Sequence, residues 1–270
     1  MQTKKFSEDI LSRPEPEDSN TERKYKEMSK EFNREEILKK ASILIDAMPY
    51  IRDFAGKIVV ICLSLSKMPS EEAEISMMQD IALLQSIGMK PIVVHDCKNK
   101  ADRYRENKRI AKEIEHCKVK AIGVCGIDFQ TLNISMQNDY IPVITPNDVD
   151  TEDKLIYPED TACEIAVGLG AEKLVFLSED AGIFDDGKLL PMVMRNEAEN
   201  LLKKGAYGEA FARRLKNSLI AIDKGVGRAH IIDCKVEHGL LLEFFSVDGI
   251  GTVIMKDHSK YYPHEKNFRF

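Results

Sequence analysis

Cysteine has the broadest chemistry of any residue type in this sequence, because a thiol can ligate a metal, form a disulfide or act as a nucleophile. No two cysteines are spaced as a C-x-x-C pair, the usual signature of a zinc site, so we expect no structural metal. The N-terminus does not resemble a secretion signal, so a disulfide framework is not expected. We therefore predict buried, reduced thiols. The six cysteines are Cys62, Cys97, Cys117, Cys125, Cys163 and Cys234.

The elements that must position the polar side chains alternate along the chain. Short apolar runs rich in β-branched residues predict strands, and the segments between them have the three- to four-residue apolar spacing of helices. Strands that are apolar throughout belong to a sheet buried on both faces, so we predict an α/β fold with a largely parallel sheet. The predicted strands are 57–63, 91–95, 120–125, 140–145, 173–178, 228–233 and 251–255. The predicted helices are 70–87, 101–117, 159–169, 195–203, 206–223 and 238–245.

The loops that follow the strands are the first places to look for a site. In a sheet of this kind, ligands bind beyond the carboxyl ends of the strands, near the point where the strand order reverses. This pattern predicts where a site lies but not which ligand it binds. The loops are 62–69, 95–100, 125–128, 145–160, 178–188 and 233–237.

The composition excludes several classes of protein. The chain has 270 residues with 39 basic and 45 acidic side chains, a formal net charge of −6, and 43% hydrophobic residues. The hydrophobic fraction excludes wholesale disorder, and the slight acidity argues against a nucleic-acid-binding surface. No apolar run approaches the roughly 20 residues that a membrane span needs. We expect a cytoplasmic protein whose partners include neither a nucleic acid nor a membrane.

The N-terminal part of the chain divides into a polar segment and a helix. Residues 1–32 are rich in charge and predict a mobile tail. The apolar spacing that follows predicts an amphipathic helix with Asn33 as its N-terminal cap. Pro49 is expected to kink or end this helix. The predicted organisation is therefore a tail (1–32), an N-terminal helix (33–56) and an α/β body (57–270).

Five blocks of the sequence carry a family resemblance. They are AMPYIRDFAGKIVVI (47–61), MMQDIALLQSIGMKPIVVH (77–95), NDYIPVITP (138–146), EDTACEIAVGLGAEKLVFLSEDAGIFDDGKL (159–189) and GVGRAHIIDCKVEHGLLLEFFSVDGIGTVI (225–254). In this order they closely resemble acetylglutamate kinases of the amino-acid kinase family. The resemblance implies a three-layer αβα sandwich with a mainly parallel central sheet. It also implies an enzyme of arginine biosynthesis that uses MgATP to phosphorylate the side-chain carboxylate of N-acetyl-L-glutamate.

The family's phosphate-binding motifs are altered in this sequence. In the family, the first strand ends in a lysine that is followed by an apolar or aromatic residue and two glycines, whereas residues 62–65 of this chain are Cys-Leu-Ser-Leu. The family's second loop, His-Gly-Gly-Gly, keeps its histidine as His95 but has lost its glycines. Phosphoryl transfer needs backbone N–H groups around the phosphates and cations for the charge on their oxygens. These losses predict a rate close to that of the uncatalysed reaction.

Four residues match positions of the family's remaining machinery. Asp160 matches the aspartate that organises two lysines in the family, and without such a pair we expect it to cap the following helix. Arg214 matches the second lysine and keeps its charge without its point-like geometry. Ser178 and Glu179 stand where the family has a Thr-Asp pair on the nucleotide side. We interpret these residues as remnants of a catalytic site and the chain as a pseudokinase.

The regulatory features of the family are retained. Arginine-sensitive members have an extra N-terminal helix that interlaces neighbouring dimers, and the predicted helix at 33–56 matches it as an oligomerisation helix. Those members bind L-arginine beside this helix, at positions that match His230, Glu243 and Gly249. A guanidinium or ammonium group requires a carboxylate and backbone carbonyls. Each residue also has a simpler explanation, because the histidine can be a bonded core residue, the glutamate can face water, and glycine suits a tight turn.

Three functions remain open at this point. The leading hypothesis is a regulatory subunit that senses L-arginine and forms a homo-oligomer, or a hetero-oligomer with an active enzyme of the arginine pathway. The first alternative is an active kinase for acetylglutamate or another small acid, with MgATP as its cofactor and a rebuilt site. The machinery left to such an enzyme would be Lys67, Lys98, Asp160 and Arg214. The second alternative is a structural scaffold that binds no ligand.

Overall fold

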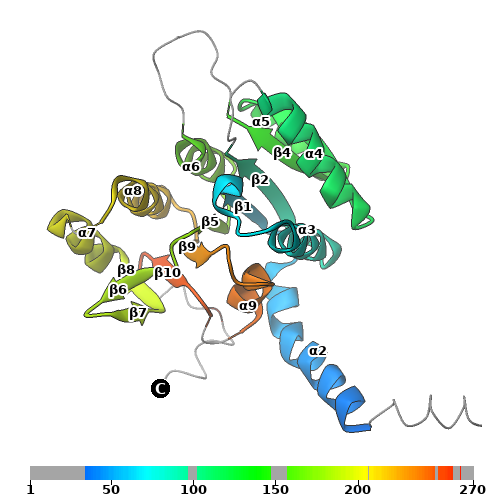
Figure 1. The fold of residues 1–270 in the computed structure, drawn as a ribbon, viewed down its shortest axis with the longest axis horizontal. Helices are drawn as coiled ribbons and strands as arrows, with labels where there is room; N and C mark the ends of the chain where they lie inside the picture. Colours follow the sequence, from blue (N-terminus) through cyan, green and yellow to red (C-terminus); the bar gives the residue numbers. More distant parts are fainter. Residues whose placement is uncertain are drawn as a thin grey trace, which may run out of the picture. The chain divides into compact units, whose positions relative to one another are not determined.

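The computed structural model of the protein describes residues 34–96, 102–146, 157–205, 207–246, 249–257 and 262. The strands of its central sheet are β1 (Ile58–Leu63), β2 (Lys90–His95), β3 (Lys120–Cys125), β4 (Tyr140–Thr145), β5 (Lys173–Ser178), β8 (Met192–Met194), β9 (Arg228–Asp233) and β10 (Thr252–Met255). They lie in the order β3-β4-β2-β1-β5-β9-β10-β8 (Figure 1). Within this sheet only β9 and β10 pair in antiparallel fashion. Two further strands, β6 (Ile183–Asp185) and β7 (Lys188–Leu190), form a separate hairpin.

The strand order reverses in the middle of the sheet. From β1 the chain continues through β2, β3 and β4 on one side, and it then crosses back to place β5 on the other side of β1. The space beyond the carboxyl ends of β1 and β5 is therefore the switch point, where proteins of this architecture bind ligands. The predicted fold class, an α/β protein with a largely parallel sheet, is confirmed.

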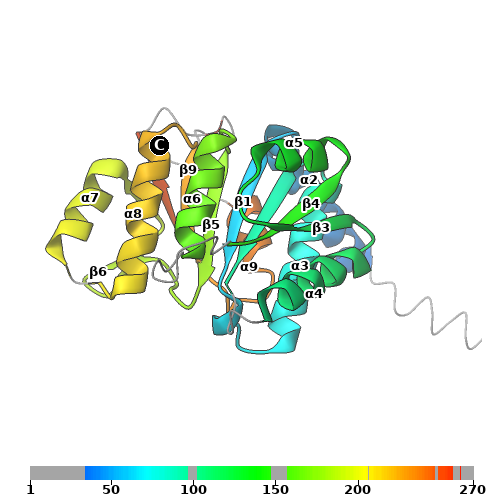
Figure 2. The same cartoon turned by 90° about the horizontal axis from the view of Figure 1, so that it is seen from above.

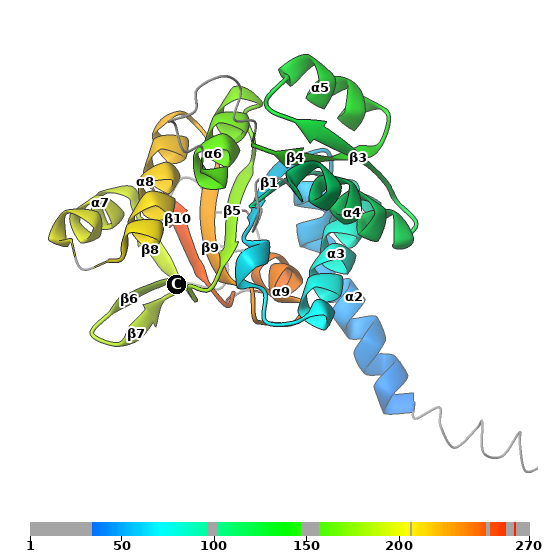
Figure 3. The same cartoon turned by 45° about the horizontal axis from the view of Figure 1, so that its top comes forward.

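Helices cover both faces of the sheet. They are α2 (Arg34–Phe54), α3 (Glu71–Ser86), α4 (Arg103–His116), α5 (Phe129–Gln137), α6 (Pro158–Gly168), α7 (Arg195–Lys204), α8 (Glu209–Asp223) and α9 (Gly239–Phe245). One face packs against α3, α4, α9 and the end of α2, and the other against α5, α6, α7 and α8. Figures 1 and 3 show α8 and α9 on opposite sides of β9, and Figure 2 shows α6 and α8 lying across β5 and β9. The arrangement is a three-layer αβα sandwich, as predicted.

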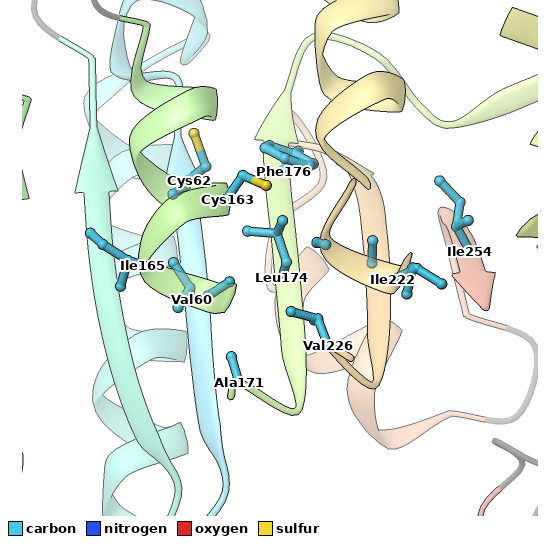
Figure 4. Close-up of a cluster of buried hydrophobic side chains, with 14 of the residues drawn as sticks. Val60, Cys62, Cys163, Ile165, Ala171, Leu174, Phe176, Ile222, Val226 and Ile254 are labelled. Carbon is cyan, nitrogen blue, oxygen red and sulfur yellow. The ribbon is translucent and has the colours of Figure 1, made fainter. Parts of the chain in front are cut away.

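The strands are apolar throughout because both faces of the sheet are covered. All residues of β5 are buried, and their side chains point alternately into the two helical layers. Figure 4 shows part of one layer, in which Cys62 of β1 and Cys163 of α6 lie in the same apolar cluster as Phe176. The cysteines that the structure describes carry free thiols. Cys234 is buried like these two, whereas Cys125 on the edge strand is exposed.

The chain divides into two compact units at a proline. The first unit is Met1–Met48 and the second is Pro49–Phe270, so the boundary falls inside α2. Pro49 was expected to kink or end this helix. The expectation that the helix ends there is wrong, because the helix continues to Phe54. Proline lacks an N–H and removes one helical hydrogen bond, but it leaves the following residues free to pack. Tyr50 and Phe54 are buried in the core of the second unit.

The structure adds short elements that the sequence pattern does not predict. The sequence analysis predicts no helix between the strands 120–125 and 140–145, whereas Phe129–Gln137 form α5. Asp128 caps that helix, because its carboxylate accepts hydrogen bonds from the N–H of Gln130 (3.1 Å) and the hydroxyl of Thr131 (2.5 Å). The turn after β1 is a 3-10 helix, η1 (Leu65–Lys67). The strands β6, β7 and β8 have three residues each, too few to show an alternating pattern.

Some expectations fall on residues outside this description. The predicted tail (1–32), the predicted cap Asn33 and Lys98, one of the residues left to an active kinase, lie outside the described residues. In the part of the chain that is described, no helix has both the length and the apolar character needed to cross a bilayer. The same part contains no group of three or more His, Cys, Asp or Glu side chains arranged to hold a metal ion.

Candidate functional site

The loop after β1 lies at the switch point and is closed against the sheet. A phosphate-binding loop would keep its backbone N–H groups free, but here the N–H of Ser64 donates to the carbonyl oxygen of Leu177 (3.0 Å) at the end of β5. Leu65 begins η1 and is buried. An apolar side chain thus enters the core at a position where close approach of a ligand would require glycine.

A carboxylate joins this loop to the loop after β2. Asp96 accepts hydrogen bonds from the backbone N–H (3.2 Å) and the hydroxyl (2.5 Å) of Ser66. Adjacent N–H and O–H groups of this kind are the donors that a phosphate oxygen would use. In this chain an internal anion uses them.

His95, at the end of β2, is a buried structural residue. Its Nδ1 lies 2.7 Å from the carbonyl oxygen of Asp96, and its Nε2 lies 3.3 Å from the side-chain amide of Asn107. Burial lowers the pKa of His95, which keeps the ring neutral near pH 7. We assign Nδ1–H as the donor to the carbonyl. His95 is therefore a strand-end histidine whose ring is bonded to the backbone.

Carboxylates surround Arg214 on the other side of the switch point. This arginine is 3% exposed on α8, and its guanidinium contacts Asp180 and Glu179 (3.5 Å), which follow β5. It also approaches Glu159 of α6 (3.6 Å). Burial raises the pKa of Glu159 and that of Asp180, although Arg214 opposes both shifts. Among the described residues, the second carboxylate oxygen of Glu159 has no hydrogen-bond partner.

Asp160 and Ser178 complete this region in ways that differ from expectation. The prediction that Asp160 caps α6 is wrong, because Tyr157 occupies the cap position and Asp160 lies in the first turn. Its carboxylate accepts a hydrogen bond from the side-chain amide of Asn217 (2.7 Å). The buried hydroxyl of Ser178 accepts a hydrogen bond from the N–H of Asp180 (3.3 Å).

Among the described residues at the switch point, negative groups therefore outnumber positive ones. Lys67 lies 3.1 Å from Glu179, and the positive charge of Arg213 also acts on Glu159. Cys62 adds no charge, because burial and then the nearby Glu159 raise its pKa well above the ordinary value and keep the thiol protonated. We call this group the acidic pole. Its members are Lys67, Asp96, Glu159, Asp160, Glu179, Asp180 and Arg214.

The second group of predicted residues lies at the opposite end of β5 and β9, on the other face of the sheet. Lys173 pairs with Arg228 at the amino ends of these strands, and Ser178 pairs with Asp233 at their carboxyl ends. The side chains of alternate residues point to the same face, so Arg228 and His230 both face the layer of α9. They line a pocket that we call the β5–β9 pocket. Its central residues are Phe54, Lys173, Arg228, His230, Glu243 and Tyr262.

The predicted pair His230 and Glu243 does come together in this pocket. The Nδ1 atom of His230 lies 2.8 Å from Oε1 of Glu243, and both side chains are buried. Burial, and then the charge of Lys173, lower the pKa of His230 to about 4, so the ring is neutral at pH 7. We assign the proton to Nδ1, because a carboxylate can only accept and because the Lys173 ammonium lies 3.5 Å from Nε2.

The predicted Gly249 is also in place, and the reason for a glycine is visible. Its φ is +62°, and a Cβ atom there would lie 2.7 Å from Oε2 of Glu243. That oxygen accepts hydrogen bonds from the N–H groups of Ile250 and Gly251, each at 2.9 Å. Although burial opposes the shift, the bonds from His230 and from this backbone hold the pKa of Glu243 below its ordinary value. Glu243 is thus a buried anion, which excludes the interpretation that it faces water.

The pocket also contains two cations that the sequence analysis missed. Lys173 is 2% exposed, and its ammonium lies over the rings of Phe54 (4.5 Å) and Phe244 (4.6 Å). Arg228, also buried, lies 3.8 Å from the ring centroid of Tyr262. The sequence contained one signal for these cations, because each of the otherwise apolar strands β5 and β9 begins with a basic residue. The pocket can attract a carboxylate through these cations and an ammonium or guanidinium through Glu243.

Comparison with known proteins places this arrangement in a family. A family model described as the amino acid kinase family matches residues 124–233. The acetylglutamate kinase of Campylobacter jejuni is 33% identical over 279 residues, which span 82% of this chain and 99% of that enzyme. The acetylglutamate kinase of a Hydrogenobaculum species is 31% identical over 284 residues, with the same coverage of 82% and 99%.

Solved structures share the fold at lower sequence identity. The N-acetylglutamate synthase of Neisseria gonorrhoeae, complexed with coenzyme A and N-acetyl-glutamate, superposes with a TM-score of 0.70 at 19% identity. That match covers 80% of this chain, which spans only 63% of the synthase chain. The carbamate kinase of Giardia lamblia bound to AMP-PNP has a TM-score of 0.61 at 12% identity, covering 75% of this chain and 99% of that enzyme. With the curated relatives, these matches show that the chain belongs to the amino acid kinase family as an acetylglutamate kinase-like member.

Proposed function

We propose that this protein is a regulatory pseudokinase of arginine biosynthesis, which binds an amino-acid effector in the β5–β9 pocket and has lost phosphoryl transfer. The observation that carries the proposal is the acidic pole. A transferred phosphoryl group needs free N–H donors and uncompensated cations. Here Asp96 uses the donors of Ser66, and Asp180 and Glu179 already neutralise Arg214.

The magnitude of these losses supports the absence of catalysis. Removing a single preorganised donor from an oxyanion-binding site costs roughly 3–4 kcal/mol of transition-state stabilisation. This chain lacks the glycine loops after β1 and β2, and a thiol, Cys62, replaces the first lysine. Three losses of this size amount to about 9–12 kcal/mol, a large share of the roughly 8–23 kcal/mol by which enzymes lower their barriers. The side chains of the acidic pole also do not fit a triphosphate, because their excess of carboxylates repels it.

L-arginine is the effector that we propose for the β5–β9 pocket. Its guanidinium or α-ammonium group would pair with Glu243, and its carboxylate would pair with Lys173 or Arg228. The same synthase from Neisseria gonorrhoeae has also been solved in complex with coenzyme A and L-arginine, and that structure has a TM-score of 0.68 with this chain at 19% identity. This likeness in fold supports the choice of arginine as the first ligand to test.

Assembly through α2 is the second part of the proposal. Five large apolar side chains of the first unit are 58–68% exposed in the isolated chain: Leu38, Ile43, Leu44, Ile45 and Met48. Apolar surface of this kind on a helix is typical of contact with another chain. We propose a second copy of this chain as the occupant, with an active kinase or synthase of the arginine pathway as the alternative partner.

Calorimetry with the purified protein tests both halves of the function. L-arginine should release heat on binding to the wild type, and Glu243→Gln should weaken binding at least about tenfold by removing the charge that faces the cation. MgATP should give no heat and no thermal shift. A wild type that gives no heat with millimolar L-arginine would overturn the effector assignment, and a clear MgATP isotherm would overturn the claim that the acidic pole does not fit a triphosphate.

An active kinase is the second candidate, favoured by the 33% identity to acetylglutamate kinases along nearly the whole length of those enzymes. In that case Arg214 would release its carboxylates and bind the nucleotide phosphates. The measurement is release of ADP from MgATP that depends on N-acetyl-L-glutamate. Turnover by the wild type would establish the kinase and exclude the pseudokinase.

A further inference from the structure

Tyr262 closes the β5–β9 pocket from the C-terminal side. This residue follows the last strand, β10, and its ring lies 3.8 Å from the Arg228 guanidinium and 5.2 Å from the Lys173 ammonium. The ring also packs edge-on against Phe54, with 5.1 Å between the centroids. Its hydroxyl donates a hydrogen bond to the carboxylate of Glu172 (2.8 Å). The Tyr262 ring thus contacts both cations of the pocket, and the rings of Phe54 and Phe244 also lie against the Lys173 ammonium.

The pocket in this form is too small for an amino acid. The free volume inside it is about 30 Å³, which is room for about two water molecules. A ligand carboxylate would need to approach Lys173 or Arg228 within hydrogen-bonding distance, and Tyr262 takes up the space beside both. The face of an aromatic ring stabilises a cation, as a ligand carboxylate would, so ring and ligand compete for the same partners.

We propose that Tyr262 is a built-in plug of the β5–β9 pocket, which an effector must displace before its carboxylate can reach Lys173 and Arg228. The inference rests on the proposed function for the identity of the effector, but the closure itself does not depend on it. The hydrogen bond from the Tyr262 hydroxyl to Glu172 holds the plug in place. The contacts of the ring with Lys173 and Arg228 stabilise it in the pocket. Affinity for an effector is therefore reduced by the fraction of molecules in which the plug is closed.

The reactivity of Lys173 tests the closure without any effector. Full-length protein is treated with an amine-acylating reagent, and modification at Lys173 is followed by mass spectrometry. Tyr262→Ala should raise the rate at Lys173 at least about tenfold, the factor that one desolvated cation–π contact represents. Tyr104→Ala is the matched control, because Tyr104 is 56% exposed and lies over Arg103 (5.1 Å) outside the pocket. An unchanged rate in Tyr262→Ala would overturn the proposal.

Milder variants keep the test valid if the alanine variant folds poorly. Tyr262→Phe and Glu172→Gln each weaken the same hydrogen bond while keeping the ring, so each should increase Lys173 modification less than alanine does. Combining them should add little to either single change, because they act on one shared bond. Independent, additive effects of the two substitutions would contradict the role of this bond in holding the plug.

Titration with L-arginine then separates the plug from the proposed function. If both are correct, Tyr262→Ala binds arginine at least about tenfold more tightly than the wild type. If Lys173 becomes reactive in Tyr262→Ala but no variant binds arginine, the closure is supported and the effector assignment is overturned. If arginine binds the wild type and Tyr262→Ala equally, the ring does not compete with the ligand, and the plug is overturned while the effector assignment stands.

Discussion

At Arg214, one buried guanidinium is shared among Glu159, Glu179 and Asp180. A lysine at such a position would donate in three directions from a single nitrogen, whereas the planar fork of arginine can hold several carboxylates at once. The charge of this guanidinium is therefore used on side chains. Asp96 likewise uses the donors of Ser66.

The first prediction concerns the stability that Arg214 provides. Arg214→Met should lower the free energy of unfolding by about 3 kcal/mol or more, because it leaves buried carboxylates without their counter-charge. Adding Glu159→Gln should recover part of the loss. Urea unfolding at pH 7 measures both effects. The control is Arg105→Met, since that side chain is 82% exposed beside Asp102, and its loss should change stability by less than about 0.5 kcal/mol.

The second prediction concerns acid stability and His230. Its pKa lies near 4 in the folded protein and near 6.5 in the unfolded chain, so below pH 6.5 the unfolded chain binds more protons. Protonation then favours unfolding, and stability falls by about 1.4 kcal/mol per pH unit until the folded pKa is reached. His230→Gln can still donate to Glu243 but does not titrate. Its free energy of unfolding should therefore fall less between pH 6.5 and pH 4, and equal pH dependence would contradict the neutral assignment of His230.

At the scale of elements, the turn between α9 and β10 organises the β5–β9 pocket. Glu243 at the end of α9 accepts hydrogen bonds from the backbone that leads into β10, which in turn pairs with β9. The glycines in this turn are required by space, because the backbone passes close to side-chain and main-chain oxygens. The pocket thus depends on how three elements meet rather than on any one of them.

The third prediction tests this junction. A Cβ atom at Gly251 would overlap the carbonyl oxygen of Ile231 in β9, so Gly251→Ala must push β10 away from β9. We expect a loss of more than about 2 kcal/mol in unfolding free energy, together with weaker effector binding. Gly208→Ala is the control, because no atom lies within 4 Å of its Cβ position and its φ is −62°. A Gly251→Ala variant of wild-type stability would disprove the tight packing.

At the scale of the whole second unit, the acidic pole lies at the carboxyl end of β5, whereas the β5–β9 pocket lies at its amino end. From Lys173 to Ser178 the strand β5 spans about 17 Å. At this distance exposed charges are screened from one another by salt. One site can therefore lose its chemistry while the other keeps its geometry, which is the combination that a regulatory pseudokinase requires.

The fourth prediction concerns assembly of the whole molecule. Leu44 in the first unit is 68% exposed, and Leu44→Glu would place a charge in the apolar face that we propose as the contact. Sedimentation velocity should show at least about tenfold weaker self-association. Lys39→Glu, a charge reversal at another exposed position of the same helix, should have a much smaller effect. Equal sedimentation of Leu44→Glu and the wild type would argue for a contact elsewhere.

The sequence predicts the larger elements well because their pattern is local. The apolar runs at β1, β2, β4 and β5 identify strands that are buried on both faces, and their boundaries agree within a residue. The short elements are harder to predict. The start of α5 is marked by a single cap residue, Asp128, and the strands β6 to β8 are too short to show an alternating pattern. Pro49 is misleading in one respect, since tertiary burial of Tyr50 and Phe54 outweighs the lost hydrogen bond.

The sequence by itself determined the α/β class, and it predicted His230, Glu243 and Gly249 as one set. These depend on residue identity and short-range spacing. Only the tertiary structure decided that Asp96 binds Ser66, that carboxylates surround Arg214, and that Tyr262 covers two buried cations. The physical reason is that such pairs join residues 30 to 89 positions apart (96 − 66 = 30; 262 − 173 = 89). No local pattern encodes their partners, because burial and the pairing of strands bring them together.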